Sequence, residues 1–125
     1  MKLPRRTLLA LSPIAATALA LATAGVAFAV APSVTYLETG SGGGGRPTTT
    51  HITIQANPNN ARVRAWERCG NGVYHLGSYH TSVGATSNTA NCGSTDHVAA
   101  AGFDYGPNPV RVTCYFGSGS RSGSC

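Results

Sequence analysis

Arginine and tryptophan recur at alternate positions of one short segment, and they are the side chains of this chain best suited to recognition. The four residues concerned are Arg62, Arg64, Trp66 and Arg68. Successive side chains of a β-strand point to opposite faces, so these four would share a face opposite Val63. Because arginine and tryptophan dominate binding hot spots, the pattern predicts a surface for an anionic polymer or an acidic protein patch. The same spacing also fits an ordinary solvated strand face, with Trp66 packed under arginine stems.

Tyrosine and histidine side chains follow in the next segment. Tyr74 and Tyr79 carry amphipathic rings that, when exposed, suit carbohydrate stacking or protein contacts. His75 and His80 are five positions apart, so a regular strand would direct them to opposite faces. We therefore assign Tyr74 and Tyr79 to the candidate binding surface and predict no metal site.

No arrangement of residues in the sequence indicates catalysis. Asp96 and His97 would form a triad on paper with one of the many serines, but the chain has no G-x-S-x-G nucleophile motif. It has only four acidic residues, and no two of them are placed for glycoside hydrolysis. The sequence therefore predicts a protein that is not an enzyme and that uses no cofactor.

The cysteines indicate a disulfide framework. The four are Cys69, Cys92, Cys114 and Cys125. An even number in an exported domain implies two bridges, for which three pairings exist. We prefer Cys69–Cys92, which closes a polar loop after the third strand, and Cys114–Cys125, which ties down the C-terminal residues. A free or intermolecular thiol at Cys125 is the alternative.

The N-terminal residues have the features of an export signal. Lys2, Arg5 and Arg6 precede an uncharged run rich in Leu and Ala, which ends at the small-x-small triplet Ala27-Phe28-Ala29. This order of basic, apolar and small segments predicts a signal peptide over residues 1–29 and a secreted, extracellular mature chain. An uncleaved membrane anchor is the alternative. We expect no membrane span after cleavage, and the Ala-rich signal would suit a bacterium.

Composition divides the predicted mature chain into three parts. Residues 30–50 form an N-terminal segment with a Gly-rich linker, residues 51–116 a β-domain, and residues 117–125 a Gly/Ser tail that ends in cysteine. Residues 30–125 hold six arginines and four acids, a net charge of +2. So small a charge argues against nucleic acid as a partner.

Apolar residues alternate with polar ones in several short runs. Ile52 and Ile54 alternate with polar neighbours, and the run from Val110 to Phe116 has the clearest period of two. Val34 to Glu38 is a further candidate strand. No helical periodicity follows residue 30. The sequence therefore predicts an all-β fold, a small disulfide-stapled antiparallel sandwich or barrel of five to six short strands, preceded by a helical signal peptide.

One short stretch resembles a known family. Tyr74-His75-Leu76-Gly77-Ser78-Tyr79-His80 is similar to the Tyr-His-x-Gly-Ser stretch of lactococcin-type bacteriocins, and the resemblance implies a secreted β-sandwich toxin. The size and two disulfides also resemble tendamistat-type α-amylase inhibitors, which present a Trp-Arg-Tyr loop. Here Trp66 is followed by Glu67 and Arg68, so no inhibitory residue transfers.

These observations favour a small secreted non-enzymatic binding protein, toxin-like or inhibitor-like. Its expected partner is an extracellular protein or a cell-envelope component. The competing interpretation is a structural or cell-surface-associated secreted protein, with flexible Gly/Ser ends acting as tethers.

Overall fold

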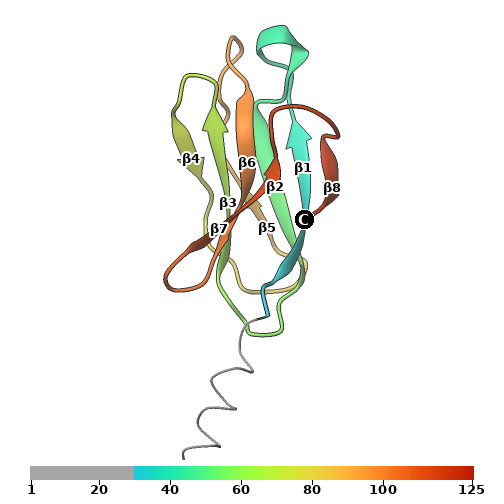
Figure 1. Cartoon of the computed structure of the whole chain (residues 1–125), viewed down its shortest axis with the longest axis vertical. Coiled ribbons are helices and arrows are strands. Elements are labelled where there is room, and N and C mark those ends of the chain that lie inside the picture. The colour runs from blue at the N-terminus through green and yellow to red at the C-terminus, as the bar shows by residue number, and fades with distance from the viewer. Residues whose placement is uncertain (1–29) are drawn as a thin grey trace, which may run out of the picture. The chain divides into compact units, whose positions relative to one another are not determined.

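The computed structural model describes residues 30–125, and this part of the chain is all-β (Figure 1). The predicted signal peptide lies outside the described residues. Eight strands form two four-stranded antiparallel sheets within residues 30–125, more than the five or six expected from the sequence. The described residues contain no helix long and apolar enough to cross a membrane.

Each sheet combines strands that are distant in the sequence. The first sheet has the order β5 (Thr86–Asn88), β2 (Thr49–Ala56), β1 (Ser33–Thr39) and β8 (Ser122–Ser124). The second has the order β4 (Tyr74–Leu76), β3 (Val63–Cys69), β6 (Val98–Tyr105) and β7 (Val110–Tyr115). Only the pairs β1–β2, β3–β4 and β6–β7 join strands adjacent in sequence.

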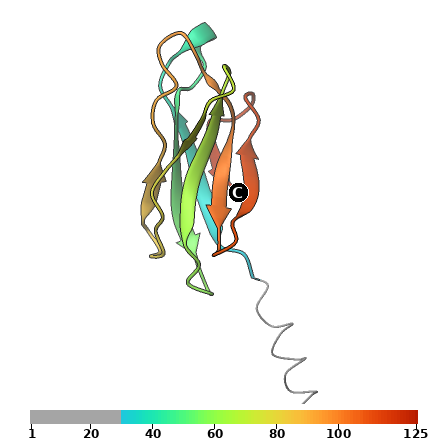
Figure 2. The same cartoon turned by 90° about the vertical axis from the view of Figure 1, so that its left-hand side faces the viewer.

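The two sheets pack face to face, as the edge-on view shows (Figure 2). Alternate residues of each strand point inward and bury their apolar side chains between the layers. Both sheets contribute to the main apolar core, which consists of Val34, Ile52, Ile54, Val63, Ala65 and Phe103. This core accounts for the alternation around Ile52 and Ile54, whereas Val110 and Phe116 in the run with the clearest alternation are exposed.

The Gly-rich segment that resembled a flexible linker is an ordered turn. It contains a short 3₁₀ turn, η1 (Gly43–Gly45), between β1 and β2. A side chain at Gly42 would drive its Cβ into the carbonyl oxygen of Asp96, and Gly44 has a φ of 71°. Glycine is therefore required here by close packing and by a left-handed backbone, which composition alone does not distinguish from flexibility.

The Gly/Ser tail is also part of the fold. β8 pairs with β1, and the amide of Cys125 donates a hydrogen bond of 2.9 Å to the carbonyl of Val34. Arg121 donates a hydrogen bond of 2.9 Å to the carbonyl of Gly40. The β-structure thus extends beyond residues 51–116 at both ends. The tail is held by backbone hydrogen bonds, which do not depend on the type of side chain. Its polar composition therefore did not indicate a strand.

Two disulfides each link a strand residue to a residue outside the strands, with the pairing that the sequence favours. Cys69–Cys92 spans 23 positions and Cys114–Cys125 spans 11. All four cysteines are paired, so Cys125 is not free. Two such bridges indicate that the chain folds in an oxidising environment.

Candidate binding face

The six residues singled out from the sequence gather at one face of the second sheet. Alternate residues of β3 point outward, away from the first sheet, and the β4 residues paired with them lie beside them. In this register Arg68 is opposite Tyr74 and Trp66 is opposite Leu76. We call this surface the arginine face and define it by Arg62, Arg64, Trp66, Arg68, Tyr74, Leu76, Tyr79, Asp104 and Arg111.

Tyr79 lies between two arginines at one end of the arginine face. The guanidinium carbon of Arg62 is 4.2 Å from the centre of the Tyr79 ring, and that of Arg64 is 4.6 Å from it. Cations over an aromatic ring are attracted to its negative face. Tyr79 therefore serves as a platform that holds both arginines, and its ring is partly covered by them.

A buried carboxylate organises the centre of the face. Asp104 on β6 is 1% exposed and accepts hydrogen bonds from Arg64 at 3.0 Å and from Arg111 at 2.8 and 3.0 Å. Burial alone raises the pKa of Asp104, but the hydrogen bonds from Arg111 and Arg64 outweigh it, so the pKa is lowered. The pKa of Arg111 is raised by the same contact. Asp104 thus fixes two guanidinium groups in place.

Trp66 is buried beneath this layer. Its side chain is 4% exposed, and its indole nitrogen donates a 3.1 Å hydrogen bond to the carbonyl of Val112. The guanidinium of Arg111 lies 4.6 Å from its ring, and the Tyr74 ring packs at 6.1 Å. Trp66 therefore supports the face from below and is not a stacking platform for a ligand, as the alternative interpretation of its spacing foresaw.

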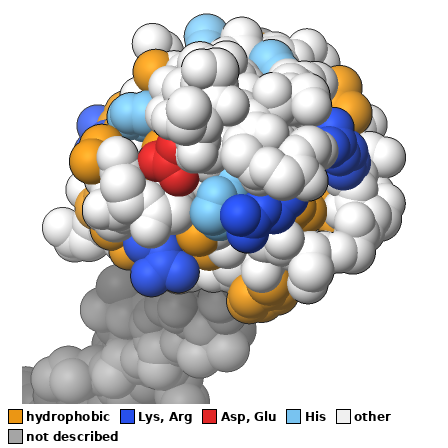
Figure 3. Space-filling view, turned by 90° about the horizontal axis from the view of Figure 1, so that it is seen from above, with side chains coloured by type: hydrophobic (Ala, Val, Ile, Leu, Met, Phe, Trp, Pro, Cys, Tyr) orange, Lys and Arg blue, Asp and Glu red, His pale blue; other side chains and the backbone are white. Residues whose placement is uncertain are grey.

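The groups left exposed on the arginine face are cationic and apolar. Arg62, Arg68 and Arg111 are exposed, and Tyr74 and Leu76 are 51% and 48% exposed. Four of the six arginines of residues 30–125 lie here. Seen along its long axis, the molecule displays arginine and histidine at several places and little acidic surface (Figure 3).

The acidic side chains of residues 30–125 contribute little to the surface. Glu38, Glu67 and Asp104 are buried, and the fourth acid, Asp96, is partly buried beside His97. The exposed charge of this part of the chain is therefore dominated by arginine.

Sequence reasoning missed Asp104 and Arg111, the residues that organise the face. The signal was present, because both flank the turn at Gly106-Pro107 and stand directly opposite each other on β6 and β7. Reading the register outward from that turn would have paired the acid with the arginine.

The histidines take separate roles. His80 forms a backbone bridge with Val63. His75 turns inward from β4, and its Nδ1 lies 2.8 Å from a carboxylate oxygen of Glu67. Glu67 and His75 form the group capable of holding a metal together with Cys69 and Cys92. In the described residues, neither Glu67–His75 nor Asp96–His97 hydrogen-bonds a serine hydroxyl.

Comparison with protein-family models, with curated proteins and with solved structures found no match. The function of the chain is therefore inferred from the geometry of the described residues alone. The resemblance of Tyr74–His80 to bacteriocins stays an interpretation of the sequence.

Proposed function

We propose that the chain is a small secreted, non-enzymatic binding protein whose arginine face engages an extracellular protein or a cell-envelope component. The observation that carries the proposal is the concentration of four of six arginines on one sheet face, with Tyr74 and Leu76 exposed beside them. Arginine and tyrosine together supply charge, planar hydrogen bonding and apolar area, which is the composition of interface hot spots.

The order of the arginine face also supports binding. Asp104 and Tyr79 hold the guanidinium groups of Arg64 and Arg111 before any partner arrives. Side chains already fixed in position lose less conformational freedom when they bind. A face that merely kept the protein in solution would not need a buried carboxylate to position its charges.

A toxin or an inhibitor is the kind of binding protein favoured here over a tethered structural protein. Flexible Gly/Ser ends were the reason to consider a tether. Both of those segments belong to hydrogen-bonded turns and strands. A rigid sandwich with one cationic face suits a soluble binder better than an anchored spacer.

The test compares two double variants with equal loss of charge. Arg62→Gln/Arg68→Gln removes two exposed cations from the arginine face, and Arg46→Gln/Arg121→Gln removes two from elsewhere. Binding to isolated bacterial cell walls and to proteins of spent medium is measured at increasing salt, with growth-inhibition and hydrolase-inhibition assays alongside. Melting temperatures verify that both variants fold.

We expect the first variant to lose most of its binding and the second to keep it. If the partner is a polyanion, wild-type affinity falls steeply with salt, because counterions are released on binding. The proposal is contradicted if both variants bind equally, or if binding to cell walls and proteins does not depend on these arginines.

A further inference from the structure

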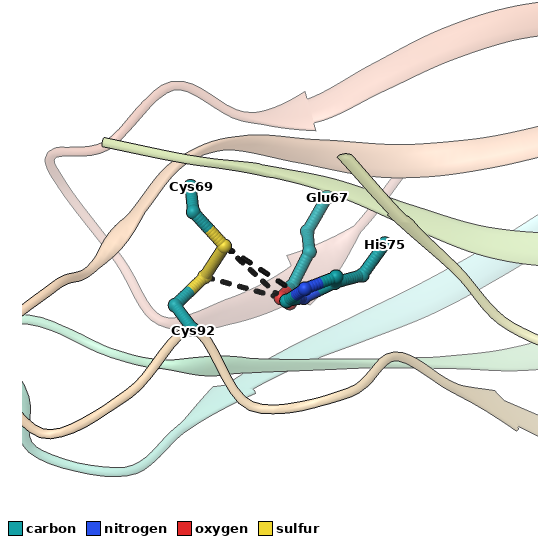
Figure 4. A group of neighbouring side chains, drawn as sticks. All are labelled: Glu67, Cys69, His75 and Cys92. Carbon is teal, nitrogen blue, oxygen red and sulfur yellow. Dashed lines mark hydrogen bonds and ion pairs between the residues drawn. A yellow bond between two sulfur atoms is a disulfide. The ribbon is translucent and has the colours of Figure 1, made fainter. Parts of the chain in front are cut away.

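A second group of side chains with chemical potential lies between the sheets, away from the arginine face. Glu67 and Cys69 are on the same inward face of β3, and His75 stands directly opposite Glu67 on β4. Cys92 comes from the loop after β5 and is bonded to Cys69. One ligand atom from each of the four lies within 4.8 Å of the others (Figure 4).

The Glu67 oxygen that lies 2.8 Å from His75 Nδ1 also contacts both sulfurs of the disulfide. This oxygen, Oε2, lies 3.2 Å from the sulfur of Cys92 and 3.7 Å from that of Cys69. Disulfide sulfurs carry no proton, so neither contact is a hydrogen bond donated to the carboxylate. A buried carboxylate oxygen is thus directed at two sulfur atoms that offer it no partner.

The distances from the Cys69 sulfur to Glu67 Oε2 and to His75 Nδ1 already match those of a tetrahedral zinc site. With zinc–sulfur bonds of about 2.3 Å and zinc–nitrogen or zinc–oxygen bonds of about 2.0–2.2 Å, ligand atoms lie about 3.3–3.8 Å apart. The sulfur of Cys69 is 3.7 Å from both Glu67 Oε2 and His75 Nδ1, and Glu67 Oε2 is 2.8 Å from His75 Nδ1. Two pairs must move apart: the two sulfurs, which are covalently bonded, and Glu67 Oε2 with His75 Nδ1, whose 2.8 Å separation is that of a hydrogen bond.

We propose that reduction of the Cys69–Cys92 disulfide opens a zinc site formed by Glu67, Cys69, His75 and Cys92. The two sulfurs need to separate from bonding distance to about 3.8 Å. A set of two thiolates, one imidazole and one carboxylate satisfies the preference of Zn²⁺ for four nitrogen, sulfur and oxygen ligands.

Neighbouring groups prepare the site. Thr89 donates a hydrogen bond to the other carboxylate oxygen of Glu67 and accepts one of 2.9 Å from the amide of Thr50. Such outer contacts orient a metal ligand. They leave the other oxygen of Glu67 facing His75 Nδ1 and the two sulfurs. His75 is 24% exposed and Cys92 is partly exposed, so a reductant and an ion have a route from solvent.

Either a phosphine or a thiol can supply the two electrons. A phosphine takes the oxygen of one water molecule to become its oxide, and that water provides the two protons. Two molecules of a low-molecular-weight thiol transfer two electrons and two protons to the disulfide, which becomes two cysteine thiols while the reductant becomes its own disulfide. Zn²⁺ then binds the two cysteines as thiolates and displaces their two protons to solvent. The disulfide form and the zinc form therefore exclude each other.

The chain contains an internal control for this proposal. The Cys114–Cys125 bridge packs against the apolar core of Val34 and Phe103 rather than beside a histidine or carboxylate. Among the described residues, the only group with metal-binding geometry is that of Cys69 and Cys92. Reduction of the other bridge should therefore create no site.

The experiment titrates metal into the purified protein before and after reduction. A phosphine reductant opens the disulfides and is removed under nitrogen. Co²⁺ is added first, because its visible absorption reports tetrahedral coordination by thiolates. Zn²⁺ is then added to displace Co²⁺, and competition with a chromophoric chelator gives the affinity for Zn²⁺. We expect one tight Zn²⁺ per reduced chain, with affinity at least about 100-fold weaker in the oxidised protein, which lacks thiolate ligands.

Four variants distinguish zinc binding by the four proposed ligands from non-specific binding by free cysteine thiols. Cys114→Ala/Cys125→Ala should bind as wild type does, and Cys69→Ala/Cys92→Ala should lose the tetrahedral spectrum. His75→Ala and Glu67→Gln should each weaken binding about 10-fold or more, because each removes one ligand of a preformed set.

A melting experiment covers the case in which the reduced protein is unfolded without metal. Zinc should raise the melting temperature of reduced wild type and of Cys114→Ala/Cys125→Ala, but not that of Cys69→Ala/Cys92→Ala. The proposal is overturned if zinc binding is independent of His75 and Glu67. It is equally overturned if zinc binds thiols without restoring a cooperative melt.

Discussion

Cys69–Cys92 and Cys114–Cys125 have nearly the same Cα separation, 5.7 and 5.4 Å, yet their surroundings differ. The first lies beside the buried Glu67 and the imidazole of His75. The second packs against the apolar core and joins β7 to the residue after β8. Cys92 also packs against a smaller apolar cluster of Val98, Ala101 and Tyr115, so the two bridges differ in whether an acid and a histidine lie beside them. Only the bridge without such neighbours is expected to be purely structural.

The polar surroundings of the first bridge extend further through the interior. Thr50 donates a 2.8 Å hydrogen bond to Glu38, and the Thr50 amide donates to Thr89, which in turn donates to Glu67. A chain of hydrogen bonds therefore links two buried carboxylates across the sheets. One oxygen of Glu38 has no partner at all. Such an oxygen is costly to bury, so Glu38 lowers the stability of the fold.

Removing each disulfide in turn should give the largest effects and tests how the two bridges differ. Loop-closure entropy predicts that Cys69→Ala/Cys92→Ala lowers the free energy of unfolding by roughly 3–4 kcal/mol, and that Cys114→Ala/Cys125→Ala lowers it by roughly 3 kcal/mol because its loop is shorter. Urea denaturation of the three proteins measures both. A larger loss from the second pair would show that packing of Cys125, and not loop length, decides the order.

The buried carboxyl of Glu38 should make the stability of the fold depend on pH. Burial raises the pKa of Glu38 from 4.5 to about 7, against the opposing hydrogen bond from Thr50, and the charge of Glu67 adds to the increase. Below pH 4.5 the carboxyl is neutral in both folded and unfolded chains. Between 4.5 and about 7 only the unfolded chain ionises it, so stability falls as pH rises, by up to roughly 3 kcal/mol.

The difference in stability between wild type and Glu38→Gln isolates this effect from those of all other groups. We expect the variant to lack the fall in stability between pH 4.5 and 7. Thr50→Val removes the hydrogen bond that lowers the pKa of Glu38, so it should move the fall to higher pH. Parallel pH profiles for wild type and Glu38→Gln would contradict the assignment.

Deletion of residues 122–125 tests the strand pairing beside the Cys114–Cys125 bridge. In the Cys114→Ala background, where the bridge is already absent, the deletion removes the hydrogen bonds between β8 and β1. At roughly 0.5–1.5 kcal/mol for each net hydrogen bond, less the ordering of the tail, we expect a further loss of about 1–2 kcal/mol. Faster hydrogen exchange at the amides of Tyr36 and Glu38, which face β8, would locate the loss, and unchanged exchange would mean that β8 pairs weakly.

The smallest expected effect is at Gly123. A Cβ at this position would lie 3.2 Å from a ring carbon of Tyr36, so the ring must shift by a few tenths of an ångström. Gly123→Ala should lower stability by less than about 1 kcal/mol. Ser122→Ala, on the same short strand, is the matched control in a thermal melt. A larger loss would show that Tyr36 cannot adjust.

The sequence predicted those parts of the fold whose side chains carry a pattern. Val110–Phe116 alternates clearly and is observed as β7 (Val110–Tyr115), and Val34–Glu38 is observed within β1 (Ser33–Thr39). β8 was missed because Ser-Gly-Ser has no apolar side chain, and only backbone bonds and a disulfide hold it. Local pattern cannot report a partner that lies about 85 positions away in the chain.

The candidate site was likewise predictable from the sequence only in part. A period of two correctly placed Arg62, Arg64 and Arg68 on a common face, because that follows from strand geometry alone. The burial of Trp66 was left open, since it depends on Arg111 from another strand. The Glu67–His75 contact was missed because it requires the register of β3 with β4, which no single segment specifies.

The pairing of β1 with β8 has a consequence for how the protein reaches its native state. The first strand to leave a ribosome or a translocation channel has a partner on only one side until residues 122–124 follow. Until then β1 is an exposed sheet edge bearing Tyr36 and Leu37, and such edges pair readily with other chains. The interval between emergence of the first and last of these strands is therefore the time at which this protein is most prone to self-association.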